Sequence, residues 1–162
     1  MKKLFLSLLG MLSLISLKAQ SDQPTAPEST TKSVYVELGG SGLVTSVNFD
    51  SRFKGSDGFG FRVGVGAIPL SSVTIVTIPV GLNYITGKGS SHFEAEVTGT
   101  FLTATKNAKF LSKALGGVVV FPHVGYRYTK PTKSFFGRIY LGPLFFGGYT
   151  LPYAGISLGY TL

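Results

Sequence analysis

Apolar and polar residues alternate with a period of two from residue 33 onward, in segments separated by short runs rich in Gly, Pro, Ser, Asp and Lys. Successive side chains of a β-strand point to opposite faces of a sheet, so this period is typical of antiparallel strands with two unlike faces. Leu38 and Leu43 fall on opposite phases of the alternation, which predicts a turn at residues 39–42. Eight strands are predicted, at about residues 33–40, 43–53, 58–68, 73–86, 91–103, 117–129, 134–146 and 152–162.

The distribution of charge indicates which face of these strands meets water. A soluble up-and-down barrel has its apolar face inside, whereas a membrane barrel turns that face to lipid and keeps a polar lumen. After residue 19, all eight lysines lie in predicted turns or in the leader, while all four arginines and four of the seven acids lie on polar strand faces. An eight-stranded lumen is only wide enough for side chains to fill it, and charges buried there must be paired.

The sequence therefore predicts an all-β, eight-stranded antiparallel up-and-down transmembrane β-barrel. Its polar phase also carries many glycines, which leave room inside for long charged side chains. The predicted luminal ion-pair network, with a structural role, consists of Glu37, Asp50, Arg52, Arg62, Glu94, Glu96, Arg127 and Arg138.

Aromatic residues stand near every strand end on the side where the chain enters and leaves the barrel. All but Tyr35 lie on the apolar phase, as expected of an aromatic girdle at a membrane interface. The longest connection, residues 104–116, falls on the opposite side, where outer-membrane barrels have their longer loops. The predicted girdle consists of Tyr35, Phe53, Phe59, Tyr84, Phe93, Tyr128, Phe135 and Tyr160.

The N-terminal residues have the pattern of an export signal. Lys2 and Lys3 precede fourteen largely apolar residues, and Ala19 supplies the small residue needed for cleavage. Residues 1–19 are therefore predicted to be a signal peptide, residues 20–32 a flexible periplasmic leader, and residues 33–162 the barrel. The apolar run is too short to span a bilayer as a helix.

The last nine residues, AGISLGYTL, resemble the C-terminal signal strand of Gram-negative outer-membrane β-barrels, with Ile156, Leu158, Tyr160 and Leu162 on its apolar phase. Together with the predicted signal peptide and eight strands, the chain is similar to small barrels of the OmpX and OmpA-membrane-domain type. The resemblance implies export through the general secretory pathway, recognition by the barrel-assembly machinery and residence in outer-membrane lipid.

Other chemistry is disfavoured by the residues present. His92 and His123 are the only histidines, and although His92 is near Glu94 and Glu96 in the sequence, no serine stands in a compelling position to act as a nucleophile. We expect no enzymatic activity, no metal site and no cofactor, and the dispersed lysines argue against nucleic-acid binding. Lys106, Lys109 and Lys113 could meet anionic lipid head groups, although a solvated loop is the alternative.

The expected function is that of a small integral outer-membrane protein with a charged, plugged lumen and a structural or interaction role. Two alternatives remain open at this point. One is a narrow channel for small solutes, and the other is a secreted soluble barrel that binds an apolar ligand inside.

Overall fold

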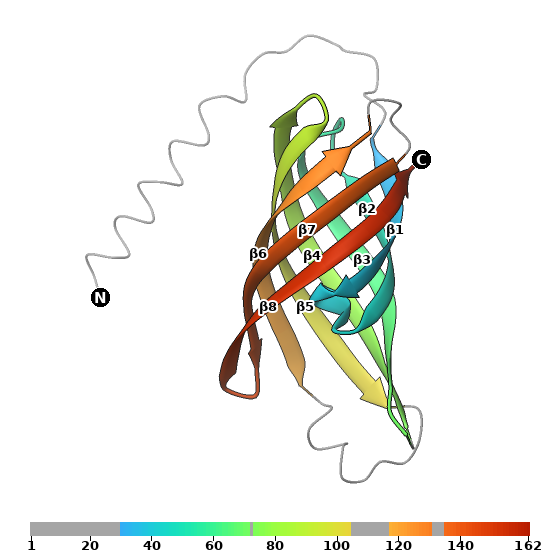
Figure 1. The fold of residues 1–162 in the computed structure, drawn as a ribbon, viewed down its shortest axis with the longest axis vertical. Coiled ribbons are helices and arrows are strands. Elements are labelled where there is room, and N and C mark those ends of the chain that lie inside the picture. Colours follow the sequence, from blue (N-terminus) through green and yellow to red (C-terminus); the bar gives the residue numbers. More distant parts are fainter. Residues whose placement is uncertain (1–29, 72, 105–116, 131–134) are drawn as a thin grey trace, which may run out of the picture.

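A computed structural model of the protein describes residues 30–71, 73–104, 117–130 and 135–162. Each strand pairs antiparallel with the next along the chain, and the last strand pairs with the first, which closes the barrel (Figure 1). This confirms the predicted all-β, eight-stranded up-and-down barrel. The strands are β1 Lys32–Gly39, β2 Thr45–Arg52, β3 Gly58–Pro69, β4 Thr74–Lys88, β5 Ser91–Ala104, β6 Val118–Thr129, β7 Phe135–Phe146 and β8 Tyr149–Thr161, with one 3-10 turn, η2 Gly40–Gly42.

The two faces of the barrel wall have the polarity predicted from the charges. Among the described residues, buried polar and charged side chains outnumber buried large apolar ones, while Val, Leu, Ile, Phe and Tyr side chains cover the exposed surface. The alternation is regular in β3, where Phe61 and Val63 are exposed on either side of the fully buried Arg62. A soluble barrel with an apolar interior has the opposite arrangement, so that alternative does not agree with the fold.

Some strands extend into residues that were predicted to lie in turns or in the leader. The loop predicted at residues 147–151 is a two-residue turn at Gly147 and Gly148, both with positive φ, and β8 already begins at Tyr149. Positive φ at both central residues suits a tight hairpin, because its twist matches that of the flanking strands. Lys32 and Lys88, predicted to lie in the leader and in a turn, are the first residue of β1 and the last of β4.

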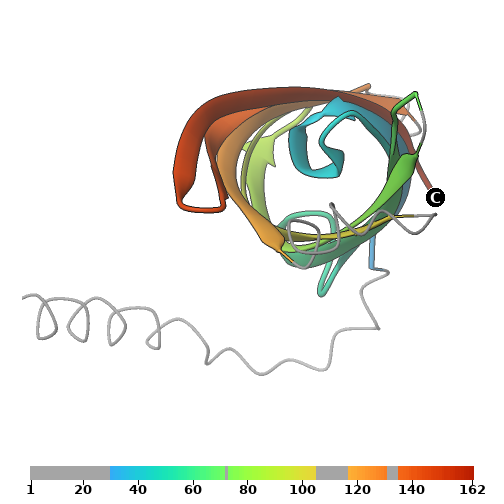
Figure 2. The same ribbon diagram turned by 90° about the horizontal axis from the view of Figure 1, so that it is seen from below.

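The wall of the barrel has unequal height. Strands β1 and β2 have 8 residues each, whereas the other six have 12 to 15. The connection between β1 and β2 does not project outward as a surface loop. It folds back as η2 into the ring of strands, which Figure 2 shows along the barrel axis. Among the described residues, no helix is long and apolar enough to cross a membrane.

Candidate functional site in the barrel lumen

The centre of the lumen holds two arginines that share carboxylates from opposite walls. Arg138 Nη1 lies 2.6 Å from Glu94 Oε1 and 3.4 Å from Glu96 Oε2, and its Nη2 lies 3.0 Å from Glu37 Oε2. Arg62 Nη1 lies 3.0 Å from Glu37 Oε2 and 3.2 Å from Glu96 Oε1. These five residues, the central cluster, come from β1, β3, β5 and β7 and are almost completely buried.

Arg127 joins the central cluster through one shared acid. It stands opposite Arg138 in the β6–β7 register, a placement that would be repulsive without an intervening anion. Glu94 supplies that anion, since it accepts from Arg127 Nε at 3.0 Å as well as from Arg138. The Arg127 guanidinium also lies over the ring of Phe136, 4.4 Å from its centroid, an arrangement typical of a cation–π contact.

Asp50 and Arg52 form a second group beside the central cluster. Arg52 Nη2 lies 2.7 Å from the Asp50 carboxylate, and both residues contact the amide of Asn83 on β4. The Arg52 guanidinium lies against the backbone of Gly60, where a Cβ atom would overlap it. Glycine on the polar phase therefore makes room for a charged side chain at this position, as the sequence suggested.

The structure thus places all eight predicted network residues inside the lumen and brings them into ion-pair contact. It adds two amides, Asn48 and Asn83, that the sequence analysis did not name. Asn48 Oδ1 accepts from Arg62 Nη2 at 2.6 Å. Both amides stand on the polar phase of their strands, and this position in the alternation could have predicted that they face the lumen.

The lumen is also closed by main chain, because η2 lies inside the barrel toward the end opposite the termini. The sequence analysis missed this feature. The amide N–H of Gly42 in η2 donates to Glu37 Oε1 at 2.9 Å. Thr100 Oγ1 donates to the Ser41 carbonyl at 2.7 Å, and Thr77 Oγ1 donates to the Gly42 carbonyl at 3.1 Å. The wall of the barrel therefore satisfies the polar backbone of this inward turn, as a buried segment requires.

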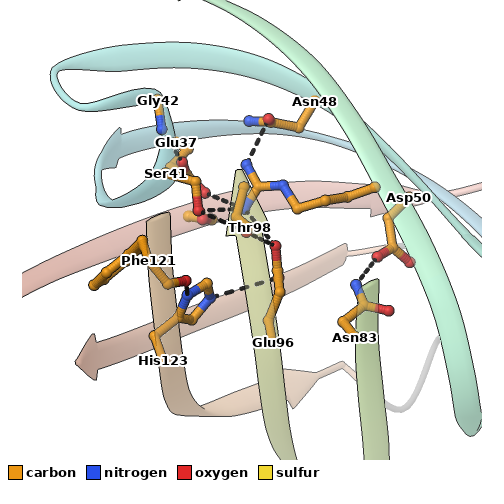
Figure 3. Close-up of polar contacts among 12 residues, drawn as sticks. Glu37, Ser41, Gly42, Asn48, Asp50, Asn83, Glu96, Thr98, Phe121 and His123 are labelled. Atoms are coloured by element: carbon orange, nitrogen blue, oxygen red, sulfur yellow. Dashed lines mark hydrogen bonds and ion pairs between the residues drawn. The ribbon is translucent and has the colours of Figure 1, made fainter. Parts of the chain in front are cut away.

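Figure 3 shows how η2 meets the charged residues below it. Ser41 Oγ accepts from Arg62 Nη1 at 3.2 Å and donates to Thr98 Oγ1 at 3.2 Å. The turn begins and ends in the left-handed backbone region, with φ of 71° at Gly39 and 72° at Leu43. Leu43 is the non-glycine residue with positive φ among those described, an unfavourable conformation held in place by the surrounding structure.

Removing one anchor of η2 measures how firmly the turn is held. Thr100→Val keeps the shape of the side chain but leaves the Ser41 carbonyl without its 2.7 Å donor, so we expect a loss of about 1–3 kcal/mol in the free energy of unfolding. Thr103→Val on the exposed face of the same strand is the control. Urea titration of the folded barrel measures both, and equal effects would show that η2 is not anchored through Thr100.

The two histidines lie in different environments. His123 is buried, its Nδ1 lies 3.1 Å from the Phe121 carbonyl and its Nε2 lies 3.5 Å from Glu96 Oε2. His92 stands nearer the solvent, 3.6 Å from an oxygen of Asp57. Within the described part of the chain, no three His, Asp or Glu side chains are arranged to hold a metal ion.

The outer face carries the other predicted features. Every predicted girdle residue except Tyr35 is exposed, and Tyr35 packs inside against Phe136 with ring centroids 5.8 Å apart. Lys106, Lys109 and Lys113 lie outside the described residues. The residues of the predicted assembly strand, all exposed on the outer face of β8 or at its end, are Ile156, Leu158, Tyr160 and Leu162.

Comparison with known proteins gives structural similarity only. No family model matches the sequence, and no curated protein matches it. The N-terminal β-barrel domain of Pseudomonas aeruginosa OprF is similar with a TM-score of 0.49 and 9% identity, over 83% of this chain and 98% of that one. A barrel from the de novo design of transmembrane β-barrels has a TM-score of 0.43 and 17% identity, over 86% of this chain and 100% of that one.

Proposed function

We propose that the protein is a small integral outer-membrane β-barrel whose lumen is plugged, and that it serves the envelope as a structural or interaction protein and not as an enzyme or a pore. The observation that supports this proposal most directly is the polarity of the wall. Apolar side chains cover the outside of every strand, and the charges inside are paired. Lipid is the solvent that fits such a surface.

The orientation follows from the rims and the chain ends. Both the start of β1 and the C-terminus lie at one end of the barrel (Figure 1). The exposed aromatic residues of the denser girdle belong to the strand ends on that side. We infer that this end faces the periplasm and that the signal peptide is removed near Ala19. Its partners would then be the secretory and barrel-assembly machineries during biogenesis and outer-membrane lipid afterwards, with Lys106, Lys109 and Lys113 as candidates for contact with anionic head groups.

Electrophoresis in SDS tests the proposed membrane barrel. A closed barrel has no free sheet edge along most of its wall, so detergent does not open it readily and the unboiled protein should migrate differently from the boiled protein. It should also float with liposomes after refolding. Full solubility of the folded protein without detergent or lipid would contradict the proposal.

A further inference from the structure

The barrel wall has a notch at the end opposite the termini. The β1–β8 register runs out at Gly39↔Gly155, so residues 149–154 of β8 pair with β7 alone. On the other side, the β2–β3 register runs out at Thr45↔Ala67. No described strand therefore lies between β8 and β3 from η2 to the end of the barrel opposite the termini. Figure 1 shows η2 beside the lower half of β8, at the base of this notch.

Behind the notch, the character of the lumen changes from charged to apolar. Val119, Phe121, Tyr140 and Leu144 form a buried cluster there, with Leu43 packed against it. Beyond this cluster, away from the termini, is an open cup of about 290 Å³, just below the range of roughly 300–1,000 Å³ typical of small-molecule sites. The cup is lined by Leu43, Leu102, Val119, Leu144, Phe146, Tyr149 and Leu151.

The cup is connected to the outer surface by apolar residues. Leu43 lines the cup, and the next residue, Val44, is exposed at the base of the notch. The hydroxyl of Tyr153 donates to the Leu43 carbonyl, which fixes Leu43 at this position. On β8, the outward-facing residues beyond Gly155 are Ala154, Pro152 and Thr150, and of these three Thr150 alone has a polar side chain.

The geometry points to a binding site for one acyl chain of a membrane lipid, which enters the cup sideways through the notch. This inference rests on the proposed membrane placement. The cup lining offers hydrocarbon and aromatic surface, and water in a cavity needs two to four polar partners. An aliphatic chain needs none, and the side chains it would pass on the way to the cup, those of Val44 and Leu43, are apolar. The luminal ion pairs below would not contact it.

The chain contains no tryptophan, so a single introduced tryptophan reports on one place. Phe146→Trp puts the reporter in the cup, and Phe145→Trp puts it at the next position of β7, on the lipid-facing side. Each variant is refolded into liposomes of phosphatidylcholine with or without bromine at mid-chain, and tryptophan fluorescence is compared. We expect strong quenching of Phe145→Trp by the brominated lipid, and quenching of Phe146→Trp at least half as strong.

A third variant shows whether quenching in the cup arises from a chain inside it. Leu102→Glu, added to Phe146→Trp, places a carboxylate in the cup lining and should reduce the quenching at least threefold, while added to Phe145→Trp it should change nothing. The SDS gel shift verifies that each variant is folded.

The outcomes separate the inference from the proposed function. Quenching of Phe145→Trp without quenching of Phe146→Trp would overturn the acyl-chain site and leave the membrane barrel standing. Quenching of Phe146→Trp that Leu102→Glu does not reduce would also overturn it, because the lipid would then reach Trp from outside the cup. Absence of quenching in both variants would contradict the membrane placement itself.

Discussion

Replacing Arg138 with methionine is expected to lower the free energy of unfolding by about 3–5 kcal/mol, the cost typical of removing one partner from a buried ionic network. Arg138 contacts three carboxylates, Glu37, Glu94 and Glu96, within 3.4 Å. Without its guanidinium, the guanidinium groups that these acids still contact are those of Arg62 and Arg127. Methionine fills much of the vacated volume, so the loss reports mainly on charge.

The matched control for this variant is Lys88→Met, which removes one positive charge from an exposed position at the end of β4. A surface charge contributes little, and we expect a change within about 0.5 kcal/mol. Urea titration of both variants in the same lipid or detergent gives the comparison. If Arg138→Met and Lys88→Met changed the free energy of unfolding by similarly small amounts, the luminal network would not stabilise the barrel.

Gly142→Ala, which adds a single methyl group, is expected to lower the free energy of unfolding by about 3 kcal/mol, the upper end of the usual cost of overpacking, or to prevent the barrel from closing. A Cβ atom at this position of β7 would overlap the Pro122 carbonyl and lie 2.8 Å from His123 Cα on β6. Both obstacles are backbone atoms of the neighbouring strand, so a change of rotamer cannot relieve them.

Gly99→Ala is the matched control, because a Cβ atom on this β5 glycine would meet only Val118 Cγ1, at an ordinary 3.6 Å. It should leave stability unchanged or raise it slightly, since alanine has less conformational freedom than glycine in the unfolded chain. The SDS gel shift and urea titration report both variants. A Gly142→Ala protein as stable as Gly99→Ala would show that β6 and β7 are less closely packed than described.

The sequence predicted the barrel well because its constraint is repeated in every strand. A residue such as Arg62, between two apolar neighbours on β3, can face only one side, and closure of eight strands makes that side the lumen. The register and the pairing partners of each arginine could not be obtained in this way. They depend on the stagger between strands, which brings Arg138 within reach of Glu37, a residue 101 positions away.

The features that were missed arise from local departures from the period. The run Gly39 to Gly42 was correctly interpreted as a break between strands, but its length does not tell whether a turn points outward or into the lumen. The inward direction depends on donors from distant strands, such as Thr77 and Thr100. The apolar end of the lumen was missed because Val119 and Leu144 simply continue the phase of their strands with a different residue type.

The plugged lumen is tested most directly by the electrical conductance of the purified, refolded protein in a planar lipid bilayer. With η2 hydrogen-bonded across the barrel and the central cluster below it, no continuous water path is expected, and the membrane current should stay at baseline over a wide range of voltage. Steady, reproducible open-channel currents from the folded protein would contradict the plugged barrel and favour a narrow channel for small solutes.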